Sequence, residues 1–244
     1  APIITRLYTP AEMGEFGMFQ RITVLLATIA TARYEYALPL PKKVKHAFIL
    51  FRFALKITII TILICLLSGI TYGIINGKGF DFYQLLLLLL ITVICLSFFN
   101  LGTNWSIRKK YFKNISMAKM TQSITLNGLR VGFGFFKAGS IGLILAYSIS
   151  FMVSALYFLK DFLLLKPKVT SKLTALRTKV LSRQYKDFPL ANLPLALSDY
   201  IRDVLVAFIL IEFFSESLFG AFDHSYRMLR IPVMLIGASL SHVF

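Results

Sequence analysis

Long apolar runs, separated by short segments rich in lysine and arginine, constrain the fold of this chain more than any other feature. The run from Tyr83 to Leu101 contains six consecutive leucines and no charged residue. A helix needs about 20 apolar residues to cross a bilayer, and several runs of this kind occur along the chain. The pattern therefore predicts an all-α, polytopic transmembrane helix bundle.

The composition supports a membrane protein. Hydrophobic residues make up 57% of the chain and charged residues 16%, whereas soluble domains are about half apolar and about a quarter charged. The net charge of +16 is also compatible with nucleic-acid binding. The basic residues, however, lie between the apolar runs, as they do in cytoplasmic loops of membrane proteins. We therefore expect the lipid bilayer as a partner and no nucleic acid.

The runs predict about seven complete spans and the outer end of an earlier one. Residues 1–15 are too polar to span and suit a turn outside the membrane, with Thr9 and Pro10 starting the next helix. The expected spans are roughly Phe16–Leu40, His46–Ile75, Tyr83–Leu101, Ser123–Phe136, Ile141–Leu159, Phe188–Phe213 and Leu218–Val243.

The distribution of basic residues predicts which turns face the cytosol. The basic turns are Lys42–Lys45, Arg108–Lys119 and Lys160–Lys186, and the turns near Gly77, Lys137–Ser140 and Ser215 contain few basic residues. Turns rich in lysine and arginine alternate along the whole chain with turns that contain few of these residues. We therefore expect the first group to be cytosolic and the second group to be external.

Arg33 and Glu35 form a charged cluster near the inner end of the first complete span. Residues two apart on a helix point to nearly opposite sides, so we expect that these two do not neutralise each other. Each then needs a partner from another helix or from water. Arg33 either extends to the lipid headgroups or lines a polar cavity, and its position in the sequence does not separate these alternatives.

Further ionisable residues lie within the later spans. Asp199 with Arg202, and Asp223 with Arg227, have the spacing of local ion pairs on a helix. Arg230 has no acidic neighbour at that spacing and shares a face with Arg227, so these two arginines could hold an anion through forked contacts. The candidate substrate-binding residues are Arg33, Glu35, Arg202, Arg227 and Arg230.

No pattern of residues indicates catalysis. His46, His224 and His242 lie far apart in the sequence, and Cys65 and Cys95 lie inside apolar runs. These residues do not have the spacing of a metal site. We expect no enzyme activity, no cofactor and no metal.

Three ordered blocks resemble bacterial polysaccharide flippases, the O-antigen, capsule and teichuronic-acid exporters of the multidrug/oligosaccharidyl-lipid/polysaccharide exporter superfamily. The blocks are Pro2–Pro10 followed by Arg33–Glu35, Tyr185–Pro189 followed by Asn192–Pro194, and Tyr226–Leu229 followed by Pro232. They extend over nearly the whole chain. The second and third resemble the starts of the seventh and eighth helices of the family, whose members carry about a dozen or more helices.

The resemblance implies an incomplete MATE-like fold with two lobes around a central cavity. Residues 1–165 would form most of the N-terminal lobe, 166–187 a basic cytosolic linker, and 188–244 the start of the C-terminal lobe. The implied function is flipping of a lipid-linked, polyprenyl-diphosphate oligosaccharide across the cytoplasmic (inner) membrane. The implied partners are that substrate and the membrane proteins of polysaccharide assembly.

Two other functions stay open. A multidrug cation antiporter of the same superfamily would favour acidic and aromatic residues in its cavity, and the charged set here contains both signs. A membrane scaffold or assembly subunit would use the charged pairs for structure alone. Binding of a lipid-linked sugar would separate the flippase from both alternatives.

Overall fold

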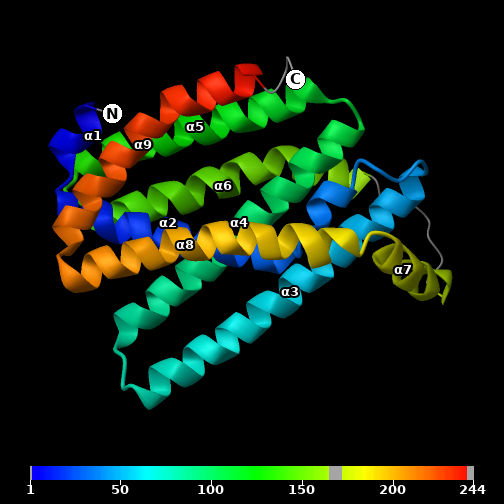
Figure 1. The fold of residues 1–244 in the computed structure, drawn as a ribbon, viewed down its shortest axis with the longest axis horizontal. Helices are drawn as coiled ribbons and strands as arrows, with labels where there is room; N and C mark the ends of the chain where they lie inside the picture. Colours follow the sequence, from blue (N-terminus) through cyan, green and yellow to red (C-terminus); the bar gives the residue numbers. More distant parts are fainter. Residues whose placement is uncertain (1, 165–171, 241–244) are drawn as a thin grey trace.

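The computed structural model describes residues 2–164 and 172–240, and side chains over 4–159 and 177–229. Within these ranges the chain is all-helical and contains no strand (Figure 1). The elements are α1 (Pro2–Leu7), α2 (Pro10–Thr31), the 3-10 turn η1 (Tyr34–Ala37), α3 (Val44–Ile75), α4 (Phe80–Arg108), α5 (Phe112–Phe135), α6 (Gly139–Leu164), α7 (Lys172–Gln184), the π-helical turn η2 (Phe188–Asn192), α8 (Leu193–Phe213) and α9 (Glu216–Leu240).

Helix α2 is the centre of the bundle. It packs against α3, α4 and α6 from the first part of the chain and against α8 and α9 from the last part. Helix α9 packs mainly on α2 and α8, so α2 provides most of the contact between the two parts. Figure 1 shows α8 crossing in front of α2, with α9 returning above it.

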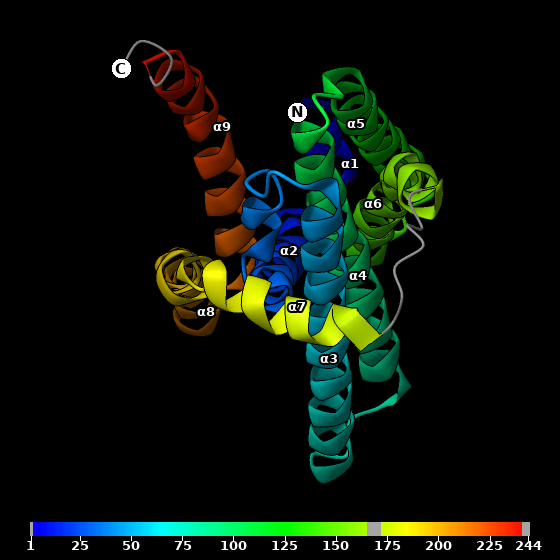
Figure 2. The same cartoon turned by 90° about the vertical axis from the view of Figure 1, so that its right-hand side faces the viewer.

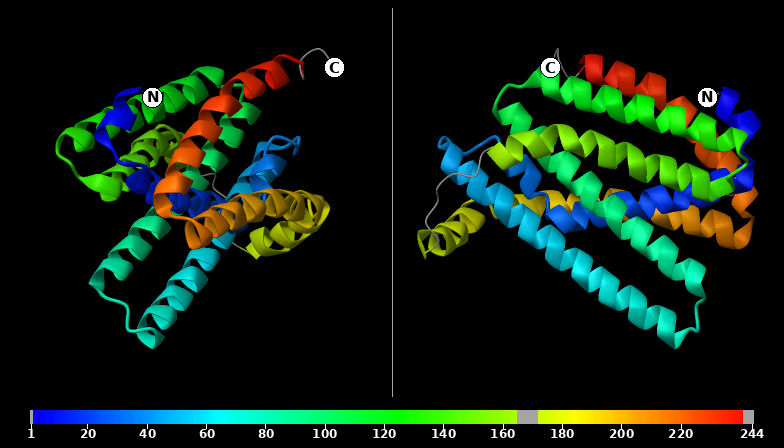
Figure 3. Two further views of the ribbon diagram at one scale, coloured as in Figure 1. Left: turned by 60° about the vertical axis from the view of Figure 1, so that its left-hand side comes forward. Right: turned by 180° about the vertical axis from the view of Figure 1, so that it is seen from behind.

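The turns fall into two groups at opposite ends of the bundle. The turns after α3, α5 and α8 lie toward the left of Figure 1, and the segments before α3 and between α4 and α5 lie toward the right, with α7. Both views in Figure 3 give the same division. The basic turns of the sequence therefore share one end, as a single cytosolic face requires.

Within the described part of the chain, three helices are long and apolar enough to cross a membrane: Val44–Ile75, Phe80–Arg108 and Gly139–Leu159. The first two form a hairpin whose far half projects from the bundle (Figure 2). Large apolar side chains on this projection, among them Ile64, Leu67 and Leu87, are exposed. Contiguous exposed apolar surface of this kind suits contact with lipid. The number of crossings beyond these three stays a prediction.

The helix of the expected span Phe16–Leu40 starts where Thr9 and Pro10 predicted, and the expected end at Leu40 is wrong. Helix α2 begins at Pro10, because Thr9 and Glu12 form a capping box in which each side chain bonds the other residue's backbone N–H. It ends at Thr31, where Ala32 and Arg33 take left-handed backbone angles with φ of 46° and 59°. A longer helix is disfavoured because Pro39 lacks an N–H and its ring would clash with the carbonyl of Glu35.

The other expected spans agree more closely with the helices. Helices α3, α4 and α6 each include the predicted span and extend beyond it. Helix α5 starts before the predicted Ser123 and ends at Phe135, just before the predicted Phe136. The expected span Phe188–Phe213 divides into η2 and α8 beside Pro189 and Pro194. Helix α9 ends at Leu240, and residues 241–243 of the last expected span lie outside the described residues. Residues 1–15, expected to form a turn, contain α1 and the start of α2. Of the expected linker, residues 166–171 lie outside the described residues and most of the rest is α7.

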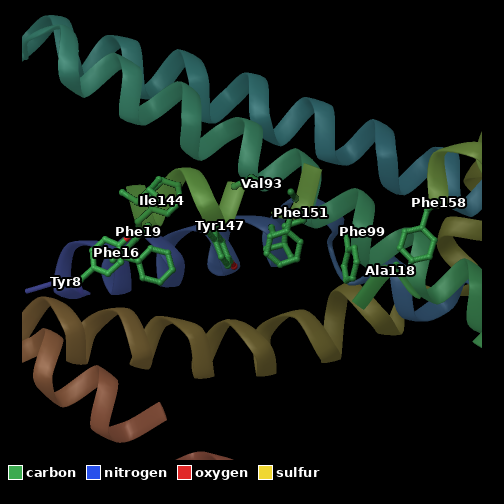
Figure 4. Packing of buried hydrophobic residues seen from close by; sticks show 14 residues of the cluster. Tyr8, Phe16, Phe19, Val93, Phe99, Ala118, Ile144, Tyr147, Phe151 and Phe158 are labelled. Atoms are coloured by element: carbon green, nitrogen blue, oxygen red, sulfur yellow. The ribbon is translucent and has the colours of Figure 1, made fainter. Parts of the chain in front are cut away.

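A row of aromatic side chains fills the space between α2, α4 and α6 (Figure 4). Phe16 meets Tyr147 edge to face with ring centroids 5.8 Å apart, and Phe151 lies 5.0 Å from Tyr147 and 5.5 Å from Phe99. Offset and edge-to-face pairs of this kind contribute more than their buried area alone. The row fixes one side of α2 and leaves its other side for α8 and α9.

Candidate functional site

Three cavities follow one another along the side of α2 that faces α8 and α9. The Arg33 cavity measures about 580 Å³, the Arg21 cavity about 280 Å³ and the Arg130 cavity about 240 Å³. Tyr200 and Asp203 line both of the first two, and Asp223 and Arg227 line both of the last two. Neighbouring cavities therefore share walls, and the series follows α2 from beyond its C-terminal end to its first turns.

The Arg33 cavity lies between the segment after α2 and the first half of α8. Arg33 and Tyr36 line it from one side, and Asp199, Tyr200 and Arg202 line it from the other. The guanidinium of Arg33 lies 5.2 Å from the ring centroid of Tyr36 and 5.8 Å from that of Tyr200. Its Nη1 also lies 3.2 Å from the Tyr36 hydroxyl oxygen. Arg33 thus lies among aromatic rings in a cavity wall, with 14% of its side chain exposed.

Arg33 and Glu35 do not lie on opposite faces, contrary to the sequence-based expectation. Arg33 Nη1 and Glu35 Oε1 are 3.8 Å apart, and the Glu35 side chain is 3% exposed. The α-helical geometry behind that expectation ends before Arg33, whose left-handed φ turns the following residues into η1. Glu35 is therefore a direct counterion of Arg33. Its second oxygen, Oε2, is buried without a hydrogen-bond partner among the described residues.

Arg202 lies between two acidic residues on the open side of the Arg33 cavity. Its guanidinium nitrogens are 3.5 Å from Asp199 and 3.4 Å from Asp203, and the Arg202 side chain is 63% exposed. The local pair expected from the spacing is present, and exposed pairs of this kind contribute little to stability. The charged residues that line this cavity are two arginines and two aspartates.

A buried aspartate on α9 pairs with arginines from two helices. Asp223 Oδ1 accepts from Arg21 Nη2 on α2 at 2.6 Å, and Asp223 Oδ2 lies 2.7 Å from Arg227 Nη2 on its own helix. Arg227 Nη1 donates to Gln20 Oε1 at 2.7 Å. The Arg21 guanidinium also lies 4.8 Å from the ring centroid of Phe219. These contacts join α9 to α2 where the Arg21 and Arg130 cavities meet.

The expected pair of Asp223 and Arg227 is present, but it is half of a larger group. Arg227 points to α2 as well as to its own helix, and 40% of its side chain is exposed. Arg230 belongs to α9, and its side chain lies outside the described side chains. The contact expected between Arg227 and Arg230 across one helix face is therefore untested. The candidate residues divide into Arg33, Glu35 and Arg202 at one end of the series and Arg227 nearer the other.

Gln20 and Arg21 are parts of the series that the sequence did not single out, and Arg130, an ionisable residue within an expected span, was not among the candidate substrate-binding residues. Arg21 lies within an apolar helix and has no acidic residue three or four positions away, which indicates a partner on another helix. Arg130 lies in α5, the least apolar of the expected spans, and it also has no acid at that spacing. The absence of an acidic residue at helical spacing is the sequence signal by which Arg21 and Arg130 could have been identified as site residues.

Close backbone packing holds α9 against the start of α2. A Cβ at Gly14 would lie 2.4 Å from the carbonyl oxygen of Glu216, and a Cβ at Gly220 would lie 1.7 Å from that of Pro10. Only glycine permits this approach on both helices. The cavity volume falls along the series from about 580 Å³ at the Arg33 end to about 240 Å³ at this end.

The described residues do not form a metal site, because no three His, Cys, Asp or Glu side chains among them are grouped to hold an ion. The polar side chains that line the three cavities are mainly those of arginine, tyrosine and aspartate, which can bind and position charged groups. Comparisons of the chain with family models, with curated proteins and with solved structures find no match.

Proposed function

We propose that this chain is part of a membrane transporter that flips a lipid-linked, polyprenyl-diphosphate oligosaccharide across the cytoplasmic membrane. The observation that supports it best is the series of three cavities with shared walls along α2. Sugars and phosphates do not cross about 30 Å of hydrocarbon unaided. A helix of 22 residues such as α2 extends about 33 Å, so polar cavities along its side would shelter a head group over that distance while the lipid tail stays outside.

The proposal includes two lobes, as in the family that the sequence resembles. Residues 1–165 would be most of the first lobe and 188–244 the start of the second, within a multi-pass protein of about a dozen or more helices. The packing is consistent with this, because α8 and α9 contact the preceding helices mainly through α2. Movement of the second lobe against α2 would open one end of the series and close the other, which is alternating access.

One observation favours the alternative of a cation antiporter. The Arg33 cavity has Asp199 and Asp203 in its wall, together with the rings of Tyr36 and Tyr200. Acidic groups and aromatic faces bind organic cations. Arg33 and Arg202 balance this charge, so the two functions differ in which of these four charged residues the substrate contacts. The scaffold alternative predicts that none of them contacts a substrate.

The test is replacement of Arg33 in the full-length protein, expressed in a strain that lacks its own polysaccharide flippase. Membrane abundance and surface polysaccharide are measured separately for Arg33→Lys and Arg33→Ala, with Arg183→Lys on the exposed side of α7 as the matched control. We expect normal abundance and lost translocation for both Arg33 variants, because lysine lacks the planar fork and stacks poorly on tyrosine. The control should retain activity.

Three results would contradict the proposal in different ways. Failure of the wild-type protein to restore polysaccharide would contradict the flippase. Full activity of Arg33→Lys would leave Arg33 as a headgroup anchor, since a long stem and a charge suffice for that role. Restoration by residues 1–244 alone would contradict the two-lobe arrangement.

A further inference from the structure

Positive charge is in excess around the Arg130 cavity. The guanidinium groups of Arg130 and Arg227 lie 4.8 Å and 5.8 Å from the centroid of the same ring, Phe16. Arg21 lies on the far side of Asp223, at 2.6 Å. Asp223 is the acid that pairs with this group, and its two oxygens contact Arg21 and Arg227 respectively. Three arginines and one aspartate leave an excess of two positive charges.

Of these three arginines, Arg130 is the one to which the described residues supply no counterion. Among the described residues its guanidinium forms no ion pair and no hydrogen bond, and its Nε is buried without a partner. Its backbone carbonyl accepts from the Tyr8 hydroxyl at 2.7 Å, which fixes the position of this part of α5. The nearby Glu12 carboxylate instead accepts from the Thr9 backbone N–H at 2.8 Å. A partly buried guanidinium left without a counterion is costly, and an anion in the cavity would remove that cost.

The cavity beside Arg130 has the lining that an anion requires. Arg227, His224 and Asp223 line it from α9, and the two carboxylate oxygens of Asp223 contact Arg21 and Arg227. Asn127 lies one turn before Arg130 on α5. Phe16 and Leu143 form its apolar wall. A volume of about 240 Å³ admits a phosphate or a diphosphate group. Arginine binds phosphate through two parallel N–H donors, and stacking on Phe16 orients the Arg130 guanidinium for such contacts.

We propose that the Arg130 cavity binds a phosphate group, with Arg130 as its principal ligand and Arg227 and His224 as further donors. The site is distinct from the Arg33 cavity, whose lining charges balance. The phosphate has two sources, a free inorganic anion or the head of an isoprenoid lipid. Only the second source rests on the proposed function.

The test is binding of inorganic pyrophosphate to the purified full-length protein in detergent, by calorimetry at constant ionic strength. Saturable binding is expected for the wild-type protein. Arg130→Gln removes the principal ligand. Asn127→Asp is an isosteric change at an exposed position, and it places a carboxylate one turn from Arg130. Arg130→Gln should weaken binding about tenfold or more, because it removes charged hydrogen bonds to the anion. Asn127→Asp should weaken binding by a smaller, measurable factor, because its carboxylate competes with the anion for Arg130. Arg183→Gln, which removes an exposed charge on α7, should bind as the wild type does.

Two results would overturn the site: saturable binding by the wild type of neither pyrophosphate nor a short isoprenoid diphosphate, or equal affinity of the wild type and Asn127→Asp for the compound that binds. The melting temperature of each variant is measured in parallel, so that a folding defect in Arg130→Gln leaves Asn127→Asp to decide.

A second titration uses a short isoprenoid diphosphate. Arg130-dependent binding of this compound but not of pyrophosphate identifies a lipid ligand, and binding of pyrophosphate alone identifies a free anion. Neither titration measures translocation, so the site and the proposed function fail separately.

Discussion

Asp223 on α9 accepts a hydrogen bond from Arg21 on α2, with Oδ1 and Nη2 2.6 Å apart and 7% and 15% of the two side chains exposed. The contact joins residues 202 positions apart in the sequence. It connects the last described helix to the central one, and it lies where two cavities meet. Removal of one partner from a buried pair of this kind is strongly destabilising, because it leaves an uncompensated buried charge.

Replacement of Asp223 by asparagine should destabilise the protein by about 3 kcal/mol, because it leaves two arginines without their shared counterion. The thermal midpoint in detergent measures the effect. Asp199→Asn is the matched control, because the Asp199 side chain is 63% exposed, and it should change stability by less than about 0.5 kcal/mol. Equal midpoints for the two variants would show that the Asp223 group has no structural role.

Gly220→Ala should separate α9 from α2. The new Cβ would lie 1.7 Å from the Pro10 carbonyl oxygen and 2.9 Å from the Gly14 nitrogen, both of them backbone atoms. Overpacking of this kind costs about 1–3 kcal/mol. Gly128→Ala in α5 is the matched control, since no atom lies within 4 Å of the Cβ it would add. There, replacement of glycine in a helix should stabilise by about 0.5–1 kcal/mol. Opposite signs for these two variants are therefore expected, and the same sign would contradict the close crossing.

The sequence predicted the helices well and their ends less well. Helices α3 and α4 follow from uninterrupted apolar runs, and the Thr9 and Pro10 signal for the start of α2 is confirmed by the capping box. The end of α2 was missed, although Pro39 and Pro41 indicated that the helix could not continue. An alanine in the left-handed region, as at Ala32, gives no sequence signal.

The candidate site was predicted only where the interactions are local. The pairs Asp199 with Arg202 and Asp223 with Arg227 followed from helical spacing. The contact of Arg21 with Asp223 depends on how α9 packs against α2, and spacing along one helix contains no information about a second helix. The same limit applies to Arg130, whose neighbours at the cavity come from α2 and α9.

Ala32→Gly should stabilise the protein. Ala32 has φ of 46° and ψ of 31° at the end of α2, a region that costs an L-residue about 1–2 kcal/mol and glycine nothing. Part of that gain is lost to the greater freedom of glycine in the unfolded chain, so a net gain of about 0.5–1 kcal/mol is expected. Ala221→Gly, an exposed position within α9, should instead lower stability by about 0.5–1 kcal/mol. A lower thermal midpoint for Ala32→Gly would contradict the left-handed end of α2.

The two groups of turns should differ in their access from outside the cell. Lys78 and Ser215 belong to turns at one end of the bundle, and Lys113 and Lys179 lie near the other end, where the basic turns gather. All four residues are exposed in the structure. Single cysteines at these positions, in a background without Cys65 and Cys95, can react with a membrane-impermeant thiol reagent applied to intact cells. Cysteines at 78 and 215 should react at once, and those at 113 and 179 only after the membrane is permeabilised.

Lysis before labelling is the control, since all four should then react equally. Reaction of the cysteine at 179 in intact cells would place α7 outside and contradict the orientation that the basic turns predict.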